Sequence, residues 1–143
     1  MGPEDAEAVA RLSGQLGYPA TAAQIQERLA RITRSPDNGF FVAERSGTVL
    51  GWVHVYGVHP LMSPSYAEVG GLVVAADARR QGIGRALMGE AEGWAQRQQY
   101  PDLRLRSGLH RADAHAFYQS IGYELTKTSH MFRKAFPAAT QSA

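Results

Sequence analysis

Residues 79–86, with the sequence Arg-Arg-Gln-Gly-Ile-Gly-Arg-Ala, constrain the fold of this chain most. They follow the apolar run 69–74 and open a helical pattern over 86–98. Two glycines one residue apart, Gly82 and Gly84, let the backbone turn sharply and pass close to a ligand. The first N–H groups of a helix have no partners within the helix, so they can converge on an anion. This glycine turn (residues 79–86) therefore predicts a pyrophosphate site between a strand and a helix.

A glycine turn also has a purely geometric explanation, because a strand-to-helix connection can need glycine for its shape alone. Other nucleotide-binding patterns fit poorly. No Lys-Ser or Lys-Thr follows Gly84, as a Walker-type loop requires, and Leu87 stands where the dinucleotide pattern has its third glycine. The segment indicates a different phosphate-bearing cofactor.

Length and composition limit the classes of protein to consider. With 143 residues we expect one domain, over residues 1–136, and a flexible tail over 137–143. The absence of cysteine excludes a disulfide framework, a thiolate metal site and a cysteine nucleophile. A net charge of +2 without a Lys/Arg block gives no nucleic-acid signal. No apolar run approaches a membrane span and no signal-peptide layout is present, so we expect a cytoplasmic protein without a membrane partner.

Hydrophobic periodicity predicts alternating helices and strands. Thr21 and Gln24 have the spacing of a capping box, which predicts a helix start at Ala22. The expected elements are helices 4–16 and Ala22–Ile32, strands 40–45, Thr48–Val58 and Tyr66–Val74, helix 86–98, strand 103–106, helix 113–121 and a closing hairpin over 123–136. Ser46 and Gly47 indicate a tight hairpin between the first two strands. This order predicts an α/β protein in which a single mixed sheet carries helices on both faces.

Two blocks carry a family resemblance. Residues 79–84, Arg-Arg-Gln-Gly-Ile-Gly, resemble the (Gln/Arg)-x-x-Gly-x-(Gly/Ala) signature of the GNAT superfamily of acyl-CoA-dependent N-acyltransferases. Residues 114–123, Ala-His-Ala-Phe-Tyr-Gln-Ser-Ile-Gly-Tyr, resemble that family's late Phe-Tyr helix ending in Gly-Tyr. The blocks stand in the family's order and at its usual separation, and the resemblance covers about residues 5–136.

The resemblance implies a GNAT-like α/β fold with a mostly antiparallel sheet. The family's fourth and fifth strands part to admit the pantetheine arm of the acyl donor. Family members usually begin with a strand, whereas this chain enters its first helical pattern almost at once. We therefore expect the first edge strand to be missing or shortened. Relatives are often homodimers, and no residue of this sequence identifies an interface.

The resemblance also implies acetyl-CoA as the acyl donor. Backbone groups on the strand before the glycine turn would pair with the pantetheine amides, and the Leu72 amide would face the thioester oxygen. The alternative for this stretch is a plain buried strand, which is compatible with backbone contacts. The expected cofactor-binding residues are Leu72, Val73, Val74, Arg79, Gln81, Gly82, Ile83, Gly84, Arg85, Ala86 and Phe117.

Acyl transfer to an amine requires an uncharged amine and a proton source for the departing thiolate. By its position in the family, Glu68 is the candidate base, and its alternative role is a solvated carboxylate that attracts a cationic substrate. Tyr118 is the candidate acid, and its alternative is a core tyrosine. Arg111 stands where many relatives have asparagine. The role of the family's asparagine is therefore not carried over to this chain.

Aromatic faces and one carboxylate suit a small cationic amine as the acceptor. The candidate acceptor-site residues are Tyr18, Trp52, Tyr56 and His59, with His54 as a further lining candidate. The histidine spacing gives no metal-ligand motif, so we expect no metal. The predicted function is transfer of an acetyl group from acetyl-CoA to a primary amine of a small molecule or peptide, by direct attack in a ternary complex. The alternative is a noncatalytic acyl-CoA-binding or regulatory module.

Overall fold

The computed structural model describes residues 2–107 and 112–138 of the chain. The chain divides into two compact units, Met1–Arg106 and Ser107–Ala143. The first unit contains the sheet and the first three α-helices, and the second contains one α-helix. Each unit is described by itself below.

A four-stranded sheet forms the centre of the first unit. Its strands, in the spatial order β1-β2-β3-β4, are β1 (Asn38–Arg45), β2 (Thr48–Val58), β3 (Tyr66–Val74) and β4 (Leu103–Leu105). The β1–β2 and β2–β3 pairs are antiparallel, and β3 pairs with β4 in parallel. The sheet is therefore mixed and mostly antiparallel, as expected. At the β1–β2 turn, Ser46 and Gly47 have φ angles of 52° and 79°, which two-residue hairpins require.

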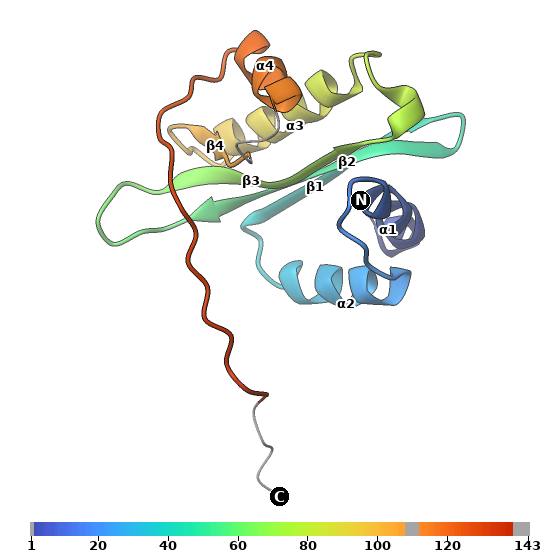
Figure 1. Cartoon of the computed structure of the whole chain (residues 1–143), viewed down its shortest axis with the longest axis horizontal. Coiled ribbons are helices and arrows are strands. Elements are labelled where there is room, and N and C mark those ends of the chain that lie inside the picture. Colours follow the sequence, from blue (N-terminus) through green and yellow to red (C-terminus); the bar gives the residue numbers. More distant parts are fainter. Residues whose placement is uncertain (1, 108–111, 139–143) are drawn as a thin grey trace, which may run out of the picture. The chain divides into compact units, whose positions relative to one another are not determined.

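Helices cover both faces of this sheet (Figure 1). The helices α1 (Ala6–Gln15) and α2 (Ala22–Ile32) lie on one face, and α3 (Ile83–Arg97) lies on the other. The capping box predicted at α2 is present. Thr21 Oγ1 accepts from the Gln24 N–H at 3.1 Å, and Gln24 Oε1 accepts from the Thr21 N–H at 3.0 Å. Residues 2–5 contain a short 3-10 helix, Pro3–Asp5, and no strand.

The main hydrophobic core lies between the sheet and α3. Val53 and Val55 on β2 are fully buried and belong to one cluster with Leu87, Ala91 and Trp94 on α3. Burial of such a side chain stabilises the fold by about 1.5–3 kcal/mol. These contacts fix α3 against the strands, and they thereby fix the position of the glycine turn that precedes it.

The β3 strand is paired on its β4 side over only part of its length. The parallel register joins Ala67 to Leu103 and Val69 to Leu105, where β4 ends. Residues 70–74 of β3 continue beyond this point without a strand partner on that side in the described part of the chain. The splay that the resemblance implies stays a prediction.

Several element boundaries differ from the expected ones, including those of α1, which spans Ala6–Gln15 where residues 4–16 were expected. The α3 helix begins at Ile83, three residues earlier than predicted, because Gly82 turns the chain with a φ of 79° and Ile83 is then buried. The β1 strand begins at Asn38, two residues early, because Asn38 pairs with Tyr56. The β4 strand ends at Leu105, one residue before the expected end.

The second unit contains α4 (Ala112–Ser120), which matches the predicted helix 113–121 to within one residue. The closing hairpin predicted over 123–136 is wrong, since residues 123–138 contain no strand. The segment has no tight-turn dipeptide such as Asn-Gly, and an isolated two-stranded hairpin is only marginally stable. Its large apolar side chains Leu125, Met131, Phe132 and Phe136 are exposed. Of the predicted tail, residues 139–143 lie outside the described chain.

Candidate active site

The glycine turn places the start of α3 at the surface. Gly82 is the N-cap residue in the left-handed region, with φ 79° and ψ 7°, and Arg80 also has a positive φ of 65°. No side chain caps this helix end within the described residues, and the first intrahelical bond runs from the Ala86 N–H to the Gly82 carbonyl at 3.0 Å. The N–H groups of the first turn therefore remain available to an anion, and the helix dipole favours negative charge there.

A basic residue that the sequence analysis missed adds to this turn. Arg45, the last residue of β1, donates a hydrogen bond from Nη1 to Gln81 Oε1 at 2.7 Å. Arg79, Arg80 and Arg85 are exposed in the same segment. No sequence signal links Arg45 to the turn, because the two are 36 residues apart and meet only through the sheet.

The strand that leads into the turn has buried side chains and an open backbone edge. Val73 is buried in the core, and Leu72 and Val74 pack against it. Across the other edge, Val73 pairs with Trp52 and Leu72 with Val53. A plain buried strand and a backbone site for an extended ligand are therefore compatible here, because the two use different atoms.

Glu68 lies on β3 opposite Tyr56 on β2. The Tyr56 hydroxyl donates to Glu68 Oε2 at 2.7 Å, and Arg106 Nε donates to Oε1 at 3.4 Å. The Glu68 side chain is 15% exposed, whereas that of Arg106 is 70% exposed. A carboxylate offers about four acceptor positions, so these two bonds leave room for a substrate amine.

Burial raises the pKa of Tyr56 to about 12, and the hydrogen bond to Glu68 acts in the same direction. Tyr56 therefore stays protonated and remains a donor to Glu68 across the neutral range. Tyr56 is the aromatic residue that is hydrogen-bonded to Glu68 in the described chain. Tyr66 instead lies under the Arg104 guanidinium, 3.8 Å from ring centroid to Cζ. The Trp52 ring lies over Gly71, where an added Cβ would come within 2.6 Å of it.

An aromatic row extends from Glu68 across the sheet. We use this name for Phe40, His54 and Tyr56. The Phe40 and His54 rings stack with centroids 4.4 Å apart, and the His54 and Tyr56 centroids are 5.1 Å apart. The row lies on the face that carries α2, because Asn38, which bonds His54, also donates to the Ile32 carbonyl at the end of α2. It gives the carboxylate an aromatic flank, as a site for a cationic amine requires.

Residues 8–123 match the family model described as the Acetyltransferase (GNAT) family. This chain belongs to the GNAT family. N-acetyltransferase 8 of Rattus norvegicus is 31% identical over 128 residues, which are 84% of this chain and 56% of that relative. The chain spans about half the length of the curated relatives it matches, with 39%, 56% and 49% for three rat proteins.

Solved structures of GNAT proteins share the fold. The aminoglycoside antibiotic 6′-N-acetyltransferase AAC(6′)-IG of Acinetobacter haemolyticus superposes with a TM-score of 0.80 at 16% identity, over 96% of this chain and 97% of that one. The aminoglycoside N-acetyltransferase AAC(6′)-Iy in complex with CoA gives 0.82 at 17% identity, over 94% and 91%. At these identities the likeness shows the fold of the GNAT chain.

Two predicted acceptor residues lie outside the contacts around Glu68. Tyr18 follows α1, is 67% exposed and has no side-chain partner within the described chain. His59 belongs to a second polar group, which we call the Asp37 cluster. In it, His59 Nε2 lies 2.9 Å from Asp37 Oδ2 and His59 Nδ1 lies 2.7 Å from Ser65 Oγ. The Tyr100 hydroxyl donates to Asp37 Oδ1 at 2.5 Å.

The two site residues of the second unit lie on α4 of this GNAT chain. The Phe117 and Tyr118 rings meet edge to face with centroids 5.3 Å apart, and Tyr118 is 6.3 Å from Tyr123. Their roles toward the acyl donor stay predictions. Arg111 lies outside the described residues.

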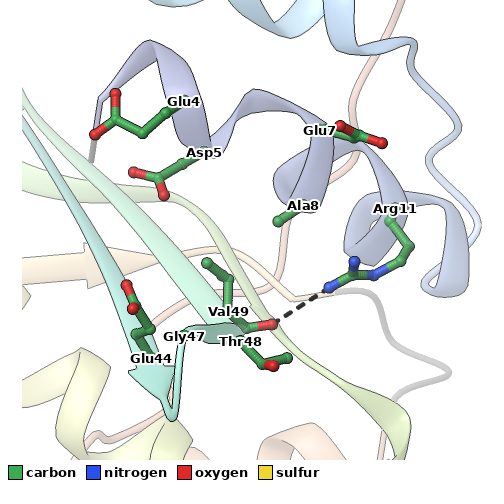
Figure 2. Close-up of a pocket in the computed structure, with 9 residues that line it drawn as sticks. All are labelled: Glu4, Asp5, Glu7, Ala8, Arg11, Glu44, Gly47, Thr48 and Val49. Atoms are coloured by element: carbon green, nitrogen blue, oxygen red, sulfur yellow. Dashed lines mark hydrogen bonds between the residues drawn. The ribbon is translucent and has the colours of Figure 1, made fainter.

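An open hollow of about 530 Å³ lies between the start of α1 and the β1–β2 hairpin (Figure 2). Arg11 reaches across it and donates to the Val49 carbonyl at 3.4 Å. It is lined by Glu4, Asp5, Glu7, Ala8, Arg11, Glu44, Gly47, Thr48 and Val49. Four carboxylates make it unsuitable for a pyrophosphate, and it contains none of the predicted site residues.

Within residues 2–107 and 112–138, no group of three His, Cys, Asp or Glu side chains is placed to hold a metal ion. None of the helices described is both long enough and apolar enough to span a bilayer.

Proposed function

We propose that this GNAT chain transfers an acetyl group from acetyl-CoA to a primary amine of a small molecule or peptide. The observation that carries the proposal is that β3, which has no strand partner beside residues 70–74 in the described chain, leads within eight residues to the uncapped start of α3 at Gly82. An extended ligand with amides at one end and a diphosphate at the other matches this path. The backbone of 70–74 offers hydrogen-bonding groups, and the turn offers converging N–H groups.

In this proposal the diphosphate binds the amides of the first turn of α3, with charge from the arginines of the glycine turn. Backbone groups of Leu72, Val73 and Val74 pair with the pantetheine arm, and the Leu72 N–H polarises the thioester carbonyl. The proposed donor-binding residues are Leu72, Val73, Val74, Arg79, Gln81, Gly82, Ile83, Gly84, Arg85, Ala86 and Phe117. Arg45 joins them through its hydrogen bond to Gln81.

Glu68 is the proposed base. The acceptor amine loses a proton to Glu68 directly or through water, and its nitrogen then attacks the thioester carbon in a ternary complex. The C–S bond breaks and the thiolate takes the proton of the Tyr118 hydroxyl. The extra proton on the attacking nitrogen passes through water to the Tyr118 oxygen, so that an amide and a free thiol remain. Tyr56 supports the base by holding one carboxylate oxygen at 2.7 Å.

A small cationic amine is the proposed acceptor class. The buried side of Glu68 is flanked by the aromatic row, so a protonated amine meets both a carboxylate and ring faces before it reacts. The related fold of the aminoglycoside acetyltransferases is compatible with such a substrate. Tyr18 and His59 remain proposed contacts at the margin of the acceptor site.

Donor binding is tested by thermal stability in excess acetyl-CoA. At 100 times Kd, a ligand stabilises the native state by about 2.7 kcal/mol. We expect a clear rise in Tm for the wild type and its loss in Gly82→Glu and Gly84→Glu. Gly89→Glu is the matched control, since Gly89 is on the same helix with open space around it. An unchanged wild-type Tm would contradict donor binding.

A turnover assay distinguishes the enzyme from the noncatalytic alternative. Free thiol is measured while the protein is incubated with acetyl-CoA and a panel of primary amines. Release with at least one amine, lost in Tyr118→Phe while acetyl-CoA binding is retained, supports the enzyme. Binding of acetyl-CoA without thiol release for any amine supports a binding or regulatory module.

A further inference from the structure

The neighbours of His54 determine which of its two ring nitrogens carries the hydrogen atom. Asn38 donates from Nδ2 to the Ile32 carbonyl at 3.1 Å and to the Ser35 carbonyl at 3.4 Å, so its Oδ1 faces His54 Nε2 at 3.0 Å. An amide oxygen only accepts, so Nε2 carries the hydrogen. Burial lowers the pKa of His54 to about 4, which keeps the ring neutral. Nδ1 is therefore left with an unprotonated lone pair.

Within the described chain this lone pair has no hydrogen-bond partner, and it is not sealed from solvent. Among the described side-chain atoms sealed from solvent, Trp52 Nε1 is the one without a hydrogen bond. His54 Nδ1 also lacks a hydrogen-bond partner within the described chain, yet it is not among the sealed atoms. An acceptor atom that has no partner and is not sealed from solvent can accept a hydrogen bond from a ligand.

The space in front of Nδ1 lies over Gly70. The β2–β3 register shifts between His54 and Val55, and Gly70 is the extra residue of this bulge. A Cβ at Gly70 would lie 3.1 Å from His54 Nδ1 and 2.7 Å from Tyr56 Cε1, and Gly70 is exposed. The missing side chain leaves an open position that touches both rings.

That position is close to the proposed base. Tyr56 Cε1 is one bond from the carbon that carries the hydroxyl, and this hydroxyl is bonded to Glu68. Neighbouring residues on one face of a strand are about 6.6 Å apart, so one small molecule can reach from His54 to the carboxylate beside Tyr56. A ligand atom over Gly70 and an amine at Glu68 can therefore belong to the same substrate.

We infer that His54 Nδ1 binds a hydrogen-bond donor of the acceptor substrate, and that the preferred acceptors are amines with a hydroxyl or second N–H two or three carbons from the reacting nitrogen. This inference rests on the proposed function, because it names the substrate class of that same site. Glu68 takes the reacting amine, and His54 selects for the second polar group. A backbone of two or three carbons is the length that we assign to this substrate from the residue spacing of about 6.6 Å along β2.

The test compares substrates that differ only in this donor. The pairs are 2-aminoethanol with 2-methoxyethylamine, and 3-amino-1-propanol with 3-methoxypropylamine. We measure kcat/KM for each by thiol release and take the ratio of alcohol to ether. The variants are His54→Gln, which keeps a group near Nε2 for Asn38 but removes Nδ1, and His130→Gln, the same substitution at an exposed histidine.

For the wild type and His130→Gln, we expect the kcat/KM of the alcohol to be about tenfold that of its ether in at least one pair. A factor of this size corresponds to one hydrogen bond. The His54→Gln ratio is expected to be near one. A wild-type ratio near one for both pairs, or a ratio that survives in His54→Gln, overturns the inference while acetyl transfer itself stands.

A binding measurement separates this inference from the proposed function. In ¹⁵N-detected histidine spectra, 2-aminoethanol or 3-amino-1-propanol is expected to shift the Nδ1 resonance of His54, and its ether partner is not. A selective shift without turnover supports the His54 contact and contradicts acetyl transfer. If neither alcohol shifts this resonance, the inference is wrong whether or not the protein turns over other amines.

Discussion

The Tyr56 hydroxyl donates to Glu68 Oε2 at 2.7 Å and thereby links β2 to the candidate base on β3. We predict that Tyr56→Phe lowers kcat/KM by about tenfold, because a hydrogen bond to a charged group contributes roughly 1.5–3 kcal/mol and holds the carboxylate in place. Steady-state thiol release checks this. Tyr66→Phe is the control, since a phenylalanine ring still packs under Arg104. Equal activity in both variants would show that Glu68 is positioned by other contacts.

His54 makes stability depend on pH in a defined direction. Its pKa is about 4 in the folded protein, against 6.5 for an unperturbed histidine. Between these values the unfolded chain binds a proton that the native state does not, so the free energy of unfolding falls as the pH drops from about 6.5 toward 4. We predict that urea unfolding at pH 7.5 and pH 5 shows a smaller acid loss in His54→Gln than in the wild type. His130→Gln should retain the wild-type loss, and an identical loss in all three proteins would contradict the assignment.

Arg45 is predicted to support acetyl-CoA binding without supporting the fold. Its bond to Gln81 lies at the surface, and exposed contacts of this kind contribute about 0–1 kcal/mol to stability. Its charge, however, lies beside the proposed diphosphate site. We expect Arg45→Gln to raise the Kd for acetyl-CoA by about threefold to tenfold in calorimetric titration, with Tm nearly unchanged. Arg28→Gln, at an exposed position on α2, should leave Kd unaltered. The same Kd in both variants would remove Arg45 from the site.

The Asp37 cluster is predicted to contribute stability where the chain leaves α3. The Tyr100 hydroxyl bonds Asp37 at 2.5 Å, and this bond together with His59 lowers the pKa of Asp37 against the opposing effect of burial. Tyr100→Phe should reduce the free energy of unfolding by about 1–2 kcal/mol in urea titration. Tyr18→Phe removes the same atom from an exposed side chain and should have no effect. A Tyr100→Phe protein as stable as the wild type would show that the cluster contributes nothing to folding.

Much of the fold could be predicted because its signals are local. The α2 helix and strands β2 and β3 have the predicted bounds, since each is set by a capping box, a turn or a run of alternating residues. The start of α3 could not be placed from sequence. Ile83 becomes helical because it packs against β2, and Gly82 rather than Gly84 is the residue that turns the chain. The hairpin over 123–136 failed for a related reason, because a strand depends on its partner as well as on its own residues.

For the candidate site, the sequence indicated candidate residues and missed neighbours that contact them across the sheet. Tyr56 and Glu68 were expected in one site and are hydrogen-bonded there. Arg106 was not expected beside Glu68, nor Asn38 beside His54, because these pairs are far apart in sequence. His59 was expected with the aromatic residues near Glu68 and instead bonds Asp37 and Ser65.

The amino-acid sequence by itself determined the order of helices and strands, the glycine turn and the GNAT resemblance, because periodicity and short motifs act over a few neighbouring residues. The tertiary structure decided which side chains meet across strands: Tyr56 with Glu68, His54 with Asn38, and Arg45 with Gln81. It also decided that β4 stops at Leu105 and leaves the edge of β3 open. Strand register and sheet length depend on contacts between distant segments, and these exist only once the core between the sheet and α3 has formed.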